Sequence, residues 1–186
     1  MPSEALLKWR NVQTPILNEL WTQYQVSSTL PPPSPLADEN LRSYVVSLSG
    51  HFQEYCRSLH SESLQVLVDA LPQPLRYSIQ LLCENGIRLA RDNVSFATLV
   101  ADFNAFGFNL SAEMKIDPGN AVLVTHLGLM NSARNFAAHR NPSPPAAGPL
   151  SPANIRTWEG SFDKLASVLE GILYNHLSTL LNRPPW

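Results

Sequence analysis

The chain has 186 residues, of which 44% are hydrophobic and 15% are charged, and this composition is typical of one globular domain with a core. The net charge of −2 excludes a protein that attracts nucleic acid through its overall charge, so a nucleic-acid function must come from a local site. No apolar run approaches the ~18–20 residues of a membrane span, and we expect no membrane partner. Cys56 and Cys83 lie outside any metal-binding or disulfide spacing, which favours a cytoplasmic location.

The first part of the chain is expected to form one amphipathic helix and a stiff connector. Apolar residues recur every three or four positions from residue 4 to about residue 25, and Pro15 is expected to kink or split this helix. Residues 31–37 are rich in proline, which predicts an extended segment. The chain therefore divides into an N-terminal helical segment (1–30), the connector (31–37) and a helical domain (38–186), which together form one structural domain.

Helical periodicity returns after the connector. It predicts helices over residues 38–70, 75–91, 121–139 and 153–181, and a shorter helix that Ser95 caps and that ends near Gly107. The helix that begins at residue 121 is expected to end at Asn141-Pro142, because proline disfavours the α conformation of the preceding residue. Residues 142–152 contain five prolines and are expected to form a loop that borders the functional site. With no strand pair and no repeat, the fold class is all-α, a single-domain bundle of five to six helices.

One cluster of residues stands out, at the end of the predicted helix 121–139. Arg134 and Asn135 are followed by His139, a combination that chance gives about 0.02 times in a chain of this composition. Motifs for nucleotide phosphates, dinucleotides, α/β-hydrolases and zinc proteases are absent, and we expect no metal and no cofactor. The functional prediction therefore depends on this cluster.

The cluster reads Arg-Asn-Phe-Ala-Ala-His over residues 134–139 and resembles the R-N-x3-H signature of the HEPN superfamily of helical ribonucleases and toxins. Residues 46–59, in which Glu54 and Arg57 follow an apolar run, resemble the early helix of its RiboL-PSP-HEPN branch. The resemblance covers roughly residues 41–181. It implies a HEPN-like fold, an RNA substrate, a toxin or phage-defence role, a homodimer and a possible antitoxin or defence-system partner protein. Toxins paired with a nucleotidyltransferase antitoxin carry a tyrosine two residues after the histidine, where this chain has Asn141, so neutralisation through that tyrosine is not implied.

The spacing of the two main residues restricts how they can meet. Arg134 and His139 are five residues apart, which places them about 140° apart around an ideal helix. Two arrangements bring them together. Either the long side chain of Arg134 reaches around to His139, which is easier if the last turn of the helix unwinds before Pro142, or two copies of the helix meet in a dimer and form one cleft.

These residue types suit a metal-independent endoribonuclease. A base must take the proton of the RNA 2′-hydroxyl, and cations must stabilise the charge of the phosphorane. His139 suits the role of base, or of acid toward the leaving 5′-oxygen, and Arg134 suits charge stabilisation. In supporting roles, Asn135 orients the histidine or binds phosphate, Arg140 holds a flanking phosphate, and Glu54 orients Arg134.

Two other interpretations stay open. Arg134, His139 and Arg140 also fit cations that stabilise the C-terminus of a helix by ~0.3–1 kcal/mol each. The acidic net charge and the absence of a long basic stripe favour a non-catalytic helical protein-interaction module, or an inactive HEPN scaffold.

Overall fold

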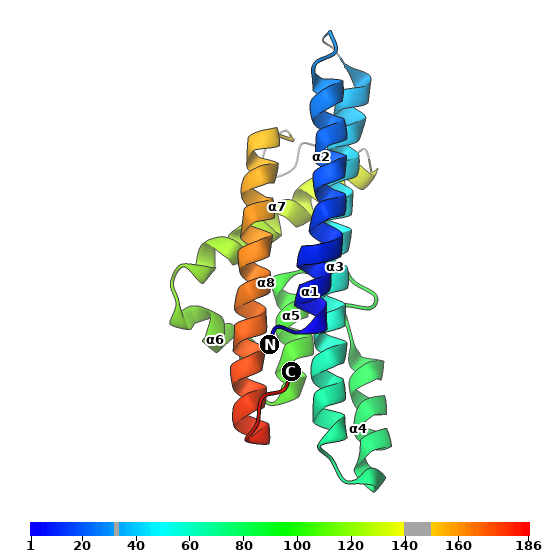
Figure 1. The fold of residues 1–186 in the computed structure, drawn as a ribbon. Helices are drawn as coiled ribbons and strands as arrows, with labels where there is room; N and C mark the ends of the chain where they lie inside the picture. Colours follow the sequence, from blue (N-terminus) through cyan, green and yellow to red (C-terminus); the bar gives the residue numbers. More distant parts are fainter. Residues whose placement is uncertain (32–33, 140–149) are drawn as a thin grey trace.

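The computed structural model describes residues 1–31, 34–139 and 150–186, without the side chains of residues 82–85, and this part of the chain is helical with no strand (Figure 1). Its elements in chain order are α1 (Glu4–Lys8), a π-helical turn (Trp9–Gln13), α2 (Thr14–Ser28), α3 (Pro35–Asp69), α4 (Gln73–Gly86), α5 (Phe96–Phe103), a 3-10 turn (Asn104–Phe106), α6 (Leu110–Ile116), α7 (Asn120–His139) and α8 (Pro152–Leu181). The all-α prediction is confirmed. With α1 and α2 counted as one continuous helix, the described residues form seven helices, and α6 is the one that the periodicity did not predict.

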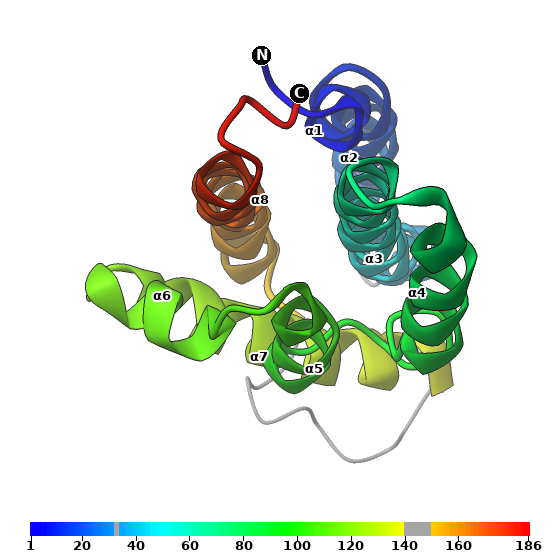
Figure 2. The ribbon, with the colours of Figure 1, turned by 90° about the horizontal axis from the view of Figure 1, so that it is seen from below.

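The two longest helices determine the shape of the molecule. α3 has 35 residues and α8 has 30, so they extend over ~52 and ~45 Å. Seen along the long axis, α8 lies opposite the α2–α3 pair, and α5 and α7 close one side between them (Figure 2). α7 crosses both long helices obliquely, whereas α4 packs against one end of α3 (Figure 1).

The helix boundaries follow from local capping. Ser34 accepts a bond from the amide of Ala37 at 3.2 Å, and Pro35 occupies the first helical position, where its missing N–H costs nothing. α3 therefore begins three residues before its expected start at residue 38. Ser95 and Thr98 form a reciprocal capping box at the start of α5.

Pro15 is accommodated by the π-helical turn that precedes it. Proline has no N–H, and its ring would collide with the carbonyl of Asn11 in a regular α-helix. The wider turn moves the hydrogen bonding by one residue, so that both the amide and the hydroxyl of Thr14 donate to the carbonyl of Trp9, the hydroxyl at 2.9 Å. The helix continues past Pro15 instead of splitting.

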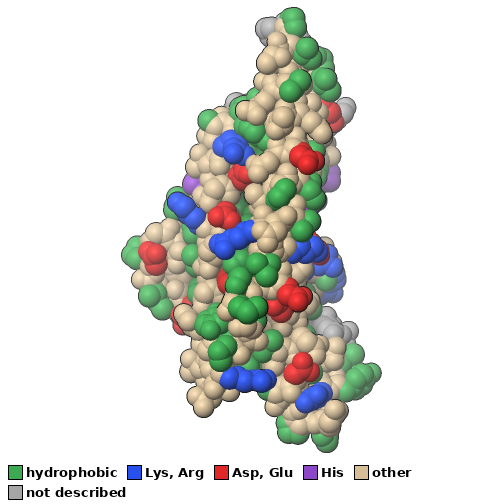
Figure 3. Space-filling view, viewed as in Figure 1, with side chains coloured by type: hydrophobic (Ala, Val, Ile, Leu, Met, Phe, Trp, Pro, Cys, Tyr) green, Lys and Arg blue, Asp and Glu red, His purple; other side chains and the backbone are tan. Residues whose placement is uncertain are grey.

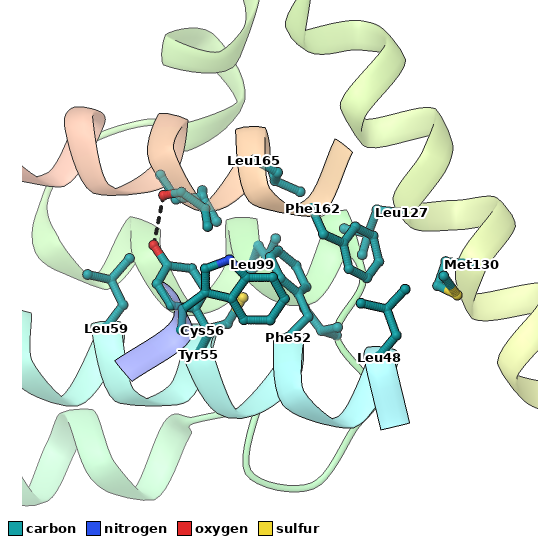
Figure 4. Packing of buried hydrophobic residues seen from close by; sticks show 14 of the residues in the cluster. Leu48, Phe52, Tyr55, Cys56, Leu59, Leu99, Leu127, Met130, Phe162 and Leu165 are labelled. Carbon is teal, nitrogen blue, oxygen red and sulfur yellow. Dashed lines mark hydrogen bonds between the residues drawn. The ribbon is translucent and has the colours of Figure 1, made fainter. Parts of the chain in front are cut away.

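The core lies where α3, α5, α7 and α8 face one another (Figure 4). Phe52 of α3 stacks on Phe162 of α8 with ring centroids 4.3 Å apart, and both side chains are buried. The hydroxyl of Tyr55 donates to the carbonyl of Ala166 at 2.8 Å, so this buried polar group has its partner. Leu99, Leu127 and Met130 complete the contact from α5 and α7.

The N-terminus is held by two carboxylates from distant parts of the chain. Glu170 of α8, itself buried, accepts the amide and the hydroxyl of Ser3, both at 2.5 Å. Glu62 of α3 accepts the next two amides, those of Glu4 and Ala5, at 3.0 and 3.1 Å. Together the two carboxylates satisfy N–H groups at the start of α1 that have no partner within the helix.

Loss of one of these carboxylates is expected to destabilise the fold. Glu170→Ala leaves two buried donors of Ser3 without an acceptor, and such a loss costs ~1–3 kcal/mol of unfolding free energy. Urea unfolding followed by circular dichroism measures it. Glu19→Ala on the exposed side of α2 is the matched control. An equal loss of unfolding free energy in both variants would contradict the role of Glu170 in holding the N-terminus.

Candidate functional site

The candidate site lies at the C-terminal end of α7, which is firmly attached to the core. Its buried face consists of Leu123, Leu127, Met130, Ala133 and Ala137. The two alanines have no bulk beyond Cβ, so α3 packs closely against this end of the helix. The side-chain amide of Asn131 also donates to the carbonyl of Val94, just before α5. The residues around 134–139 therefore stand on a rigid support.

The motif residues lie along the outer side of this helix. Arg134 is half-buried at the edge of the core-facing side, and its Nη1 donates to Oδ1 of Asn135 at 3.2 Å. Asn135 and His139 are both exposed, and one helical turn separates them, so they share a face. The structure thus brings Arg134 together with Asn135, and places Asn135 beside His139.

Arg134 and His139 themselves stay on different sides of α7. The helix remains regular through His139, and residues 140 and 141, the rest of the turn that was expected to unwind before Pro142, lie outside the described residues. At 100° per residue the two side chains leave the axis about 140° apart. A site that uses both must therefore reach around the helix or combine two chains.

A further arginine approaches the same end of α7 from α3. The guanidinium carbon of Arg42 lies 5.0 Å from the centroid of the Phe136 ring, and its Nε donates to Asp38 Oδ2 at 2.8 Å. Arg42 is not among the site residues that the sequence led us to expect. The Asp38–Arg42 spacing indicates an ion pair within the helix, but a contact with Phe136 of another helix leaves no sequence signal.

Of the other expected supporting residues, Glu54 has a different partner and Arg140 is not described. Glu54 accepts a bond from Lys8 Nζ at 3.3 Å, and among the described residues no bond joins it to Arg134. The carboxylate therefore faces α1, to which Lys8 belongs. Arg140 and most of the expected loop at 142–152 lie outside the described residues.

A second group of polar residues lies between the first half of α7 and α8. His126 Nδ1 lies 2.7 Å from the hydroxyl of Ser161, whose own proton goes to the carbonyl of Thr157. His126 lines an open groove of about 720 Å³ together with Arg156, Asp163 and Lys164. Thirteen residues separate His126 from His139, ~20 Å along α7, so this groove is not part of the motif end.

Three further searches gave negative results. Among the side chains that the structure describes, which leave out residues 32–33, 82–85 and 140–149, no three of the types His, Cys, Asp and Glu are grouped to hold a metal ion. No helix in this part of the chain has both the length and the apolar character to cross a membrane. Comparison with family models, curated proteins and solved structures gave no match.

Proposed function

We propose that the protein is a metal-independent endoribonuclease whose catalytic residues are Arg134 and His139. The observation that carries the proposal is the presentation of Arg134, Asn135 and His139 at the surface of one well-anchored helix end. The only bond that ties up Arg134 among the described residues is the one to Asn135, itself exposed, so the guanidinium keeps donors for a phosphate.

The proposed reaction needs proton transfer and charge stabilisation. The 2′-oxygen attacks the adjacent phosphorus, and its proton passes to a base, for which His139 is the candidate. Arg134 donates to the phosphorane oxygens, and the bond from phosphorus to the 5′-oxygen breaks as that oxygen takes a proton. The products are a 2′,3′-cyclic phosphate and a 5′-hydroxyl. One neutral imidazole takes the proton of the 2′-hydroxyl as base. A second imidazole, which is protonated, gives its proton to the leaving 5′-oxygen as acid.

A homodimer supplies that second imidazole. In a two-fold interface the same patch of each copy meets its counterpart, so one motif contributes two histidines and two arginines. The dimer also allows Arg134 of one copy to approach His139 of the other, although the two side chains point in different directions from the same helix. A toxin or phage-defence role, with an antitoxin or defence-system partner protein, rests on the resemblance to the HEPN superfamily.

The experiment that tests the proposal is cleavage of single-stranded RNA in the presence of EDTA, with analysis of the product ends. We expect cyclic phosphate and 5′-hydroxyl ends, and no cleavage when the nucleotide 5′ of the scissile phosphate carries a 2′-deoxy sugar. Products with 5′-phosphates, or activity that requires Mg²⁺, would show that the proposed chemistry is wrong.

The second candidate is a non-catalytic protein-interaction module. Leu75, Tyr77 and Leu81 of α4 are 52, 74 and 45% exposed, which is unusual for large apolar side chains on one helix. On the face shown in Figure 3, Lys and Arg side chains lie among acidic ones instead of forming a stripe. A wild-type protein without nuclease activity would favour this candidate.

A further inference from the structure

The angular positions of Arg134, Phe136 and His139 around the axis of α7 show which of them lie on the same side of the helix. Phe136 and His139 are three residues apart and lie about 60° from each other, whereas Phe136 and Arg134 lie about 160° apart. Arg42, which covers Phe136, is therefore on the flank of α7 that carries His139. Arg134 occupies the opposite flank.

Arg42 is held in a fixed position. Its guanidinium carbon lies over the Phe136 ring, and Asp38 accepts its Nε proton. Its side chain is 20% exposed, and the two terminal amino groups have no bond to another residue in the part of the chain that the structure describes. A guanidinium that is already oriented loses little conformational freedom when it binds a phosphate.

We propose that Arg42 contacts the substrate: it donates to a phosphate of the RNA beside His139, on the side of the imidazole opposite to Arg134. The inference rests on the proposed nuclease function and extends its site from one helix to two. Among the described residues of one copy, Arg42 and not Arg134 is then the arginine on the flank of α7 that carries His139.

The test compares Arg42→Met with Arg156→Met. Methionine retains apolar contact with the aromatic ring and removes the charge. Arg156 is the matched control, because it also lies over an aromatic ring, that of Trp21 at 5.1 Å, and pairs with a carboxylate, Glu159. It lines the groove of His126, away from the motif end.

Binding of an uncleavable 2′-deoxy oligonucleotide gives a readout that a purely structural role would not change. We expect Arg42→Met to weaken this binding at least ~10-fold, because a hydrogen bond to a charged group is lost. The salt dependence, as the slope of log K against log salt, falls by ~0.7, the value for one phosphate contact on a single strand. Arg42→Lys, which keeps the charge, retains part of the affinity.

The outcomes separate this inference from the function on which it rests. If wild type cleaves RNA and His139→Ala does not, while Arg42→Met binds and cleaves like Arg156→Met, Arg42 has a structural role and the inference is wrong. A wild-type protein that neither cleaves RNA nor binds the oligonucleotide would overturn both. Lower thermal stability in Arg42→Met with an unchanged salt slope also counts against the phosphate contact.

Discussion

His139→Ala is expected to lower the rate of RNA cleavage by ~10²–10⁴-fold, the contribution of a positioned acid–base group. His139 is exposed at the end of α7, so its loss removes no core packing, and the variant should unfold at the same urea concentration as wild type. Single-turnover cleavage in EDTA measures the effect.

The control for this variant is His51→Ala. His51 is half-buried on α3, and burial lowers its pKa, with Glu54 and Lys8 as the charged groups nearby, away from the end of α7. We expect cleavage by this control to match that of wild type. Equal activity of His139→Ala and wild type would remove His139 from the mechanism.

Arg134→Gln is expected to lower the cleavage rate by ~10²–10³-fold, as does the loss of one donor that stabilises a transition state. Arg134→Lys should keep part of the activity, because the charge remains while the forked geometry of the guanidinium is lost. The exposed Arg183, which lies beyond α8, gives the control Arg183→Gln. A lysine variant as inactive as the glutamine variant would mean that geometry, and not charge, is required.

The His139→Ala variant also tests the dimer. If both imidazoles of one cleft are needed, a dimer of one wild-type copy and one His139→Ala copy is inactive. An equimolar mixture of the two proteins then keeps about a quarter of the wild-type activity, since about a quarter of the dimers carry both histidines. A mixture that keeps half of the activity, or light scattering that shows an active monomer, would contradict a site shared between copies.

The sequence predicted the helices that are long enough to show periodicity. α3 was expected as one helix despite Gly50, and α7 and α8 lie within a residue of their expected bounds, because proline and capping residues mark their starts. α6 was missed because its seven residues span only two turns, too few for a periodic pattern to emerge. The only local signal for it is Asn109, which accepts the amide of Ala112 and caps the helix.

The site was predictable only where it is local. Helix geometry alone gives the angle between Arg134 and His139, and the regular end of α7 keeps it. The partners of Glu54 and Arg42 depend on which faces of α3 turn toward α1 and α7. The packing of the whole bundle determines which faces meet. The bond of Glu54 to Lys8 and the contact of Arg42 with Phe136 are therefore tertiary contacts, which a local sequence pattern does not predict.

The hydrogen bonds from Ser3 to Glu170 affect the order in which the chain can fold. Its two partners, Ser3 and Glu170, are 167 residues apart in sequence. At ~5–20 residues per second on the ribosome, the start of α1 waits for roughly 8–33 seconds before Glu170 has been synthesised. During this interval α2 and α3 can pair, but Trp9 and Leu6 lack the helix α8 that helps to cover them. Synthesis of α8 therefore completes the packing around α1, and a nascent chain that stalls before residue 170 exposes its N-terminal apolar surface.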